Sequence, residues 1–208
     1  MLSFAALLGF GLAVLPLVVT PGASFTLVSA RGLAGDRRGA RAVIAGTALG
    51  ILTHGLFAGV GLAAVVMRSA EAYQILRLVG AVYLVALGSL LVVRAARGQG
   101  SSTAVVRPPA KNAAKEIGRA YLANVLNVKA ATVYLTLAPQ FVPVQSVRVG
   151  SMVTLAFVHV LVMAAWLGLW STGLVAMSAR FNIATWKRRI DLAGGAVLVF
   201  LGVRSARP

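Results

Sequence analysis

Six long apolar segments dominate this sequence, and they constrain its fold more than any other feature. They are separated by short stretches rich in Arg and Lys, and they cover residues 2–30, 42–67, 72–93, 119–144, 149–179 and 183–203. A helix needs about 20 apolar residues to cross the hydrocarbon core of a bilayer. None of the segments alternates apolar and polar residues with a period of two, so helices are expected rather than barrel strands. The sequence therefore predicts an all-α integral membrane protein with six transmembrane helices.

The composition supports a membrane location and argues against a nucleic-acid partner. Of the 208 residues, 59% are hydrophobic and 12% are charged, whereas soluble domains carry about 25% charged residues. The net charge of +16 comes from basic residues in the gaps between apolar segments rather than on one amphipathic face. The chain has no cysteine, which excludes disulfides, thiolate metal ligands and a cysteine nucleophile.

The N-terminal stretch could be either a cleaved signal peptide or a first membrane span. Residues 2–19 are as apolar as a signal peptide, but no basic region precedes them. The apolar sequence also continues beyond Pro21 and Gly22 instead of leading into a soluble domain. We therefore interpret residues 2–30 as a retained first span.

Basic residues are distributed unevenly between the two sides of the predicted membrane domain. Loops one, three and five hold fourteen Arg and Lys residues, whereas the opposite side holds five. Cytoplasmic loops carry the excess of basic residues in membrane proteins, so we expect these loops in the cytoplasm and both termini outside. The richness in Ala, Val, Gly and Arg is typical of a GC-rich bacterial genome, and the predicted location is the bacterial cytoplasmic (inner) membrane.

Residues 95–118 form the only real linker within what we interpret as a single transmembrane domain, residues 1–208. This basic linker, which we expect in the cytoplasm, separates residues 1–94 from residues 119–208, and each part contains three predicted spans. Because three is odd, the second set must be inverted relative to the first. Inverted repeats are common in transporters, with the substrate site at their interface. Two similar stretches, 78–88 and 192–202, share glycines eight residues apart, although helix packing alone also favours such glycines.

The first segment contains a predicted helix break at Thr20-Pro21-Gly22-Ala23-Ser24. Proline removes a helix hydrogen bond and clashes with the preceding turn. A break inside the membrane creates a half-helix N-terminus, which favours an anionic group such as a carboxylate. Thr20, Pro21, Gly22 and Ser24 are therefore candidate substrate or pathway residues, and an ordinary kink is the simpler alternative.

The fourth segment is long enough to cross a bilayer, yet it contains Asn124, Asn127, Lys129 and Gln140. A charge at bilayer depth costs at least about 2.5–3.5 kcal/mol and usually faces a bundle interior or a water-filled cavity. Lys129 lies about 15 Å along an ideal helix from Arg119, which makes snorkelling to an interface difficult. These four polar residues are candidate substrate-binding or pathway residues.

The two histidines are His54 in the second span and His159 in the fifth. Histidine titrates near neutral pH, so His54, which lies in mid-span, is a candidate proton-linked residue. For His159 we favour a neutral ring that is hydrogen-bonded to another helix. No acidic residue lies at mid-membrane, because the four acids fall in or near loops at Asp36, Glu71, Glu116 and Asp191. We therefore expect no metal site and no site for a cationic drug.

Several motifs in order along the chain resemble one known family. They are TPGAS at 20–24, GDRRGARAVIAGTALG at 35–50, GLAAVVMRS at 61–69, LVGAVYLVALG at 78–88 and NVLNVKAATVYLTLAPQF at 124–141. Together they are similar to the bacterial lysine/homoserine/threonine exporter superfamily of the LysE/RhtB type. The resemblance implies amino-acid efflux driven by the proton gradient, without ATP or a bound cofactor. Val128 stands where the family motif Asn-Pro-Lys has proline, so the sequence leaves open whether the helix breaks there.

The leading hypothesis is a secondary exporter of small amino acids or related zwitterions rather than an enzyme. The substrate carboxylate is expected at the break around Gly22 or at Lys129, with Asn124 and Asn127 contacting the rest, and a basic amino acid is not favoured. One alternative is a lipid-modifying membrane enzyme, which normally needs clustered His, Asp or Glu residues that this sequence lacks. Another is a membrane subunit that does not transport. The expected partners are a small-molecule substrate and the bilayer, and a homo-oligomer is left open.

Overall fold

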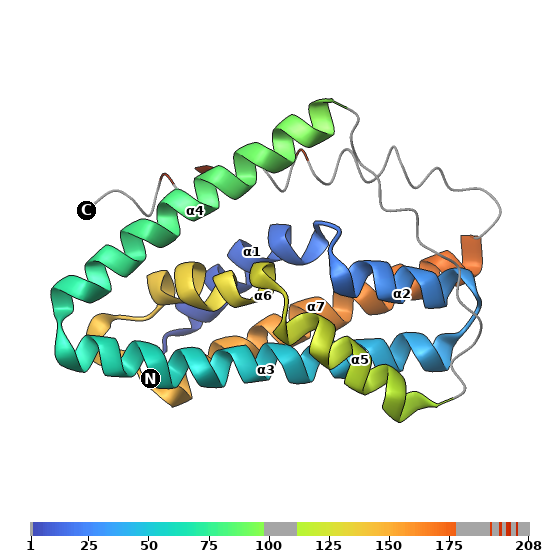
Figure 1. The fold of residues 1–208 in the computed structure, drawn as a ribbon, viewed down its shortest axis with the longest axis horizontal. Coiled ribbons are helices and arrows are strands. Elements are labelled where there is room, and N and C mark those ends of the chain that lie inside the picture. The colour runs from blue at the N-terminus through green and yellow to red at the C-terminus, as the bar shows by residue number, and fades with distance from the viewer. Residues whose placement is uncertain are drawn as a thin grey trace.

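The computed structural model describes residues 2–97 and 112–177, together with five separate positions between 192 and 203. Every regular element in these ranges is helical, which confirms the all-α prediction (Figure 1). The α-helices are α1 Phe4–Val19, α2 Ala23–Leu33, α3 Arg37–Arg68, α4 Ala70–Ala96, α5 Ala113–Val125, α6 Val128–Thr132 and α7 Val149–Met177. Between α6 and α7 lie a π-helix, η1 Val133–Leu137, and two 3-10 helices, η2 Ala138–Phe141 and η3 Val144–Ser146.

Two helices of the described part are long and apolar enough to cross a membrane by themselves. They contain the stretches Arg37–Leu62 in α3 and Val149–Gly173 in α7. The pair α1 and α2 adds a third span if it is counted as one element bent by 63°. The predicted span 183–203 lies largely outside the described residues. The complete set of six spans and the inverted relation of the two halves therefore stay predictions.

The predicted first span is two helices separated by three residues. Thr20 ends α1, and its backbone N–H donates to Pro16 O at 3.0 Å. Pro21 has no N–H and cannot continue the ladder, and α2 starts after Gly22. The φ of Gly22 is −146°, an extended value open to any residue. The break therefore depends on Pro21 and not on the conformational freedom of glycine.

The fourth predicted span, 119–144, is likewise not one continuous helix. Its first part belongs to α5, which ends at Val125. The side chain of Asn127 then accepts a hydrogen bond from Lys129 N at 3.0 Å and caps the N-terminus of α6. This answers the question that Val128 left open, because the helix breaks without a proline. Val128 occupies the first helical position, where a backbone N–H has no partner within the helix.

The predicted linker, 95–118, is shorter than expected at its far end. Helix α5 begins at Ala113 because the Asn112 side chain accepts hydrogen bonds from the N–H groups of Ala114 and Lys115. An asparagine cap of this kind is strongly preferred at helix starts. Residues 113–118 are therefore helical, whereas residues 98–111 lie outside the described part of the chain.

Helix α3 packs against its neighbours through glycines. A Cβ atom added at any of four α3 glycines would lie within 3.0 Å of a neighbouring helix. The glycines are Gly46 and Gly50, which face α5, and Gly55 and Gly59, which face α7. Small residues of this kind let helices approach closely in membranes. Helix α3 therefore lies between α5 and α7 in close backbone contact with both.

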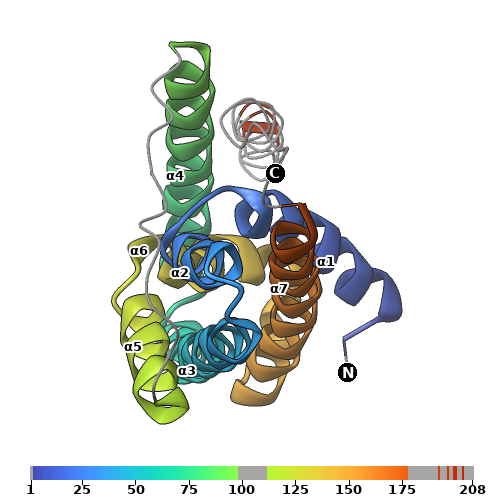
Figure 2. The same cartoon turned by 90° about the vertical axis from the view of Figure 1, so that its right-hand side faces the viewer.

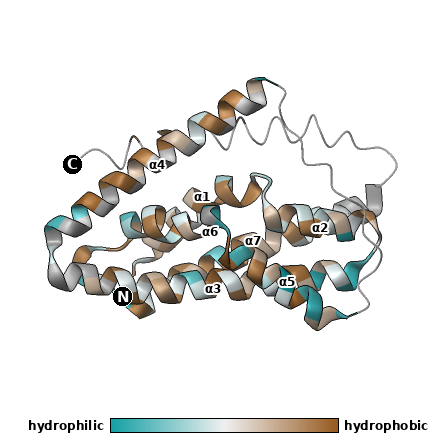
Figure 3. Cartoon of the chain, viewed as in Figure 1, coloured by the Kyte–Doolittle hydropathy of each residue, from teal (hydrophilic) through white to brown (hydrophobic). Residues whose placement is uncertain are grey.

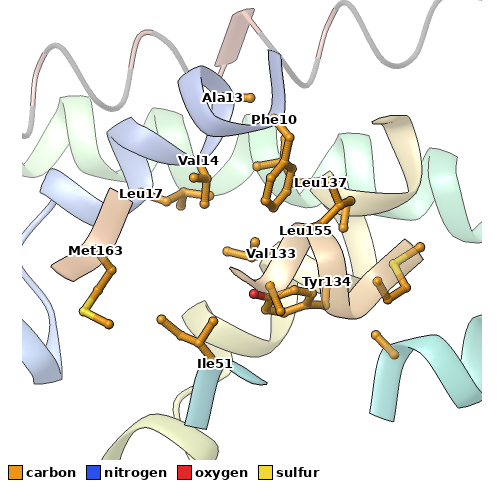
Figure 4. Close-up of a cluster of buried hydrophobic side chains, with 14 of the residues drawn as sticks. Phe10, Ala13, Val14, Leu17, Ile51, Val133, Tyr134, Leu137, Leu155 and Met163 are labelled. Carbon is orange, nitrogen blue, oxygen red and sulfur yellow. The ribbon is translucent and has the colours of Figure 1, made fainter. Parts of the chain in front are cut away.

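The buried core is formed by apolar side chains from α1, α3, η1 and α7. Figure 4 shows Phe10, Val14, Val133, Tyr134 and Leu155 among the side chains that point toward one another there. Figure 2 shows α4 standing to one side of the group formed by the other labelled helices. Figure 3 shows hydrophobic residues along the labelled helices, and many of the large ones are exposed, among them Phe4, Phe57 and Leu169. An apolar exterior of this extent suits contact with lipid.

Candidate functional site

The two helix breaks of the chain meet at one hydrogen bond. The Lys129 ammonium, in the first turn of α6, donates to the Thr20 carbonyl oxygen at the end of α1, with an Nζ···O distance of 2.7 Å. The Thr20 hydroxyl donates backward to Pro16 O at 2.6 Å. Lys129 thus lies beside the Pro21–Gly22 break.

A cavity of about 60 Å³ surrounds this contact. Six of the predicted site residues line it, namely Thr20, Gly22, Ser24, Asn124, Asn127 and Lys129, and Pro21 lies between two of them in the chain. Ligand pockets usually measure about 300–1,000 Å³, and a water needs about 10–15 Å³. The cavity therefore has room for a few waters, and it must widen to admit a larger molecule.

The electrostatic character of the cavity is positive. The Lys129 ammonium contributes a full charge, and the N-terminus of α2 opens onto the cavity at Gly22, Ala23 and Ser24. No side chain caps that N-terminus, so its partial positive charge and its N–H groups face the cavity. None of the lining residues in the described part of the chain is Asp or Glu. Such a site favours a carboxylate over a cation.

Neutral hydrogen-bond acceptors complete the cavity. Asn124 is 4% exposed, and its Oδ1 is buried without a hydrogen-bond partner within the described structure. A buried carbonyl oxygen without a partner costs about 1–3 kcal/mol, which a donor from a ligand can recover. Ser24 Oγ accepts from the Thr47 hydroxyl of α3 at 3.1 Å. Thr47 also lines the cavity, and the sequence analysis did not single it out.

The two histidines have different positions relative to the cavity. His159 is 6% exposed and lines it, and its Nδ1 lies 3.0 Å from the Tyr134 hydroxyl. The predicted hydrogen bond of His159 to another element is therefore confirmed, but its place in the cavity wall was missed. Met163 and Leu167 follow it on the same face of α7 and line the cavity too. His54, the predicted proton-linked residue, is not among the lining residues.

His54 instead lies behind the cavity wall. Its Nε2 is 3.1 Å from the backbone oxygen of Asn124. Its ring stacks on Tyr134, with 6.2 Å between the ring centroids and an interplanar angle of 14°. Gln140 also lies outside the lining, and its amide donates to Thr136 O at 2.8 Å. The roles of His54 and Gln140 in a pathway stay predictions.

A buried cluster of charges joins the two half-helices that lead away from the breaks. Arg31 of α2 is 5% exposed, and it contacts Glu116 of α5 through two bonds, Nη2···Oε1 at 2.6 Å and Nε···Oε2 at 3.2 Å. Asp36 lies 3.5 Å from the same guanidinium. Two of the four acidic residues of the chain therefore contact one arginine. The sequence placed these acids near loops but did not predict the pairing, which depends on long-range packing.

Comparison with known proteins identifies the family. A sequence model of the LysE type translocator family matches residues 4–207. The chain belongs to this family. Membership makes it a membrane translocator rather than an enzyme, and the hypothesis of a lipid-modifying enzyme is set aside. No solved structure matches the chain.

Several bacterial proteins are similar to this chain at moderate identity. A protein of Salmonella typhi named homoserine/homoserine lactone efflux protein is 29% identical over 175 residues, covering 79% of this chain and 78% of that protein. An uncharacterized membrane protein of Bacillus subtilis, YrhP, is 29% identical over 72% of this chain and 74% of its own length. An uncharacterized membrane protein of Vibrio cholerae is 29% identical over 60% of this chain, and the match spans 58% of that protein.

Proposed function

We propose that this protein exports small amino acids, or related zwitterionic metabolites, from the bacterial cytoplasm in exchange for protons. The observation that carries the proposal is the hydrogen bond between Lys129 Nζ and Thr20 O, which joins two helix breaks around a polar cavity. Membership of the LysE family and the similarity to proteins named homoserine/homoserine lactone efflux protein support it.

The substrate carboxylate binds at the positive side of the cavity in this proposal. Lys129 and the uncapped N-terminus of α2 supply a charge and N–H donors there. The substrate ammonium group lies toward the neutral polar residues of the cavity wall, among them Asn124 and Asn127. A second positive charge on the substrate would find no acidic partner among the lining residues. The proposed substrates are therefore small amino acids with neutral side chains.

Alternating access requires the cavity to open toward each side in turn. On one side, α2 and α5 are joined by the Arg31–Glu116 ion pair. On the other side, Phe10 of α1 packs edge-on against Phe141 of η2, with ring centroids 5.7 Å apart. We propose that these two contacts close the cavity at its two ends. We further propose that the protein lies in the inner membrane with six spans, inverted halves and external termini. The cavity is built within one chain, so the proposal needs no second copy.

An efflux assay with the purified protein tests this function. Liposomes containing the protein are loaded with radiolabelled homoserine, threonine or lysine, and the initial efflux rate is measured with and without an imposed pH gradient. We expect homoserine and threonine to leave these liposomes faster than they leave protein-free liposomes, and an imposed pH gradient should increase both rates further. Lysine should leave more slowly than homoserine and threonine. If the inserted protein moves no amino acid of a broad panel, the alternative of a subunit that does not transport is favoured.

A further inference from the structure

Among the described residues that line the cavity, one belongs to a type that ordinarily titrates near neutral pH in water. Histidine is the only residue type whose ordinary pKa falls in that range, and the chain has two histidines. His159 lines the cavity, whereas His54 does not. We infer that His159 is the residue at which a proton and the ammonium group of the substrate compete, so that binding of one expels the other. This inference rests on the proposed export function.

The charges around His159 explain why the two ligands exclude each other. The titratable groups that face its ring are Lys129 on α6, His54 on α3 and Tyr134 in η1. Lys129 attracts the substrate carboxylate, so a short zwitterion points its ammonium group away from Lys129 and toward the rest of the cavity wall. An imidazolium at His159 would add a positive charge to that wall. It would repel the ammonium group in a space that holds only a few waters.

Hydrogen bonding at the ring favours the same exclusion. A neutral imidazole has one nitrogen that accepts a hydrogen bond, whereas an imidazolium has two donors and no acceptor. The Tyr134 hydroxyl can donate to or accept from Nδ1, so it can stabilise either form of the ring. We assign Tyr134 as a positioning residue that orients the ring through Nδ1. Nε2 is then the ring nitrogen left for a ligand, and it can accept from an ammonium group only while the ring is neutral.

This competition gives the stoichiometry of an exchanger. When the cavity faces the cytoplasm, a substrate molecule binds and the proton on His159 leaves to the cytoplasm. When the cavity faces outward, the substrate leaves and a proton from outside binds His159. Each cycle moves one proton inward and one substrate outward without any change of redox state. No acidic residue of the described cavity wall is needed for this cycle.

Proton release on binding tests the inference directly. Homoserine is added to the detergent-solubilised protein in weakly buffered solutions that cover the pH range in which the protein stays folded, and the pH change is recorded at each starting pH. The wild type should release protons, and its apparent homoserine affinity should fall up to about tenfold per pH unit on the acid side. His159→Asn should release none and bind homoserine with an affinity independent of pH. In liposomes, it should lose acceleration of homoserine efflux by the pH gradient.

Matched variants separate coupling from folding. His54→Gln changes the other histidine, which lies outside the cavity lining, and should still release protons because His159 is kept. Tyr134→Phe keeps the ring and should shift the pH midpoint of proton release without abolishing it. All variants are compared at equal concentrations of monodisperse protein.

Three outcomes would overturn the inference. The first is proton release from His159→Asn. The second is loss of release in His54→Gln alone. The third is homoserine binding or efflux by the wild type with no pH response, which would remove proton coupling while leaving the export function intact. Failure of the wild type to move any amino acid would instead overturn the proposed function and this inference with it.

Discussion

Lys129 and Thr20 are separated by 109 residues in the chain, yet the ammonium of the first donates to the carbonyl oxygen of the second at 2.7 Å. Thr20 can offer this oxygen because α1 ends there, and a carbonyl at a helix C-terminus has no partner within the helix. Lys129 reaches it because Asn127 starts a new helix two residues earlier. One hydrogen bond therefore depends on both breaks.

Lys129→Met should distinguish a substrate with a free carboxylate from one without it. Loss of a charge-assisted hydrogen bond costs about 1.5–3 kcal/mol, so homoserine efflux at low concentration should fall about tenfold to a hundredfold. Homoserine lactone has the ammonium group but no carboxylate, and its movement should change much less. Initial rates in liposomes check this, with Lys115→Met, at an exposed position of α5, as the control. Equal losses for both compounds would remove Lys129 from carboxylate binding.

Substitutions of Gly22 should act through the space beside Lys129 and not through backbone strain. A Cβ atom added at Gly22 would lie 3.6 Å from Lys129 Nζ, which is an ordinary contact. Gly22→Ala should therefore keep most of the efflux rate. Gly22→Leu places three more carbons there and should reduce homoserine efflux by about tenfold or more. Similar rates in both variants would show that the first break is only a kink.

Val128→Pro should be tolerated and should be less harmful than Gly22→Leu. Val128 is the first residue of α6, where proline is over-represented because its missing N–H has no helical partner to lose. We expect homoserine efflux within about twofold of the wild type at matched protein levels. A severe loss in this variant would mean that the fourth segment depends on a hydrogen bond from the Val128 N–H.

Glu116→Gln should destabilise the protein. Removing one partner of a buried ion pair costs about 3–5 kcal/mol, and the lower end applies because Asp36 still contacts Arg31. The temperature at which half of the detergent-solubilised protein stays monodisperse should fall by several degrees. Glu71→Gln, at an exposed position in the first turn of α4, should cost only a few tenths of a kcal/mol and leave this temperature almost unchanged. Equal effects would show that the Arg31 cluster contributes nothing beyond a surface charge.

The absence of native cysteine makes the predicted topology accessible to labelling. Cysteines introduced at Ser102 and next to Pro208 are treated in whole cells with a thiol reagent that does not cross membranes. The excess of basic residues in the odd-numbered loops predicts labelling near Pro208 and none at Ser102. The reverse pattern would invert the assigned orientation.

Local signals in the sequence predicted the positions of the breaks better than their causes. Pro21 predicted the first break, because a missing N–H acts within one helical turn. At the second break, Val128 in place of proline left the helix break undecided in the sequence. The break instead depends on the Asn127 side chain, which caps the start of α6. His159, Thr47 and the Arg31–Glu116 pair could not be assigned in advance. Their positions depend on how each helix is rotated against its neighbours, and the hydrophobic pattern of an apolar helix constrains that rotation weakly.

The glycines of α3 connect the packing of the bundle to the chemistry of the cavity. An added methyl group at Gly50 would lie 2.6 Å from Asn124 Oδ1, and one at Gly55 would lie 2.6 Å from Ala156 Cβ. Sliding of α3 against α5 or α7 would bring bulkier residues into these close contacts. Close packing at these glycines therefore opposes sliding of the three helices, and the short segment at Pro21 is the hinge that the proposed cycle would use. In the proposed site, a residue larger than glycine at position 50 would change substrate affinity by displacing Asn124, from the side of the wall that faces away from the cavity.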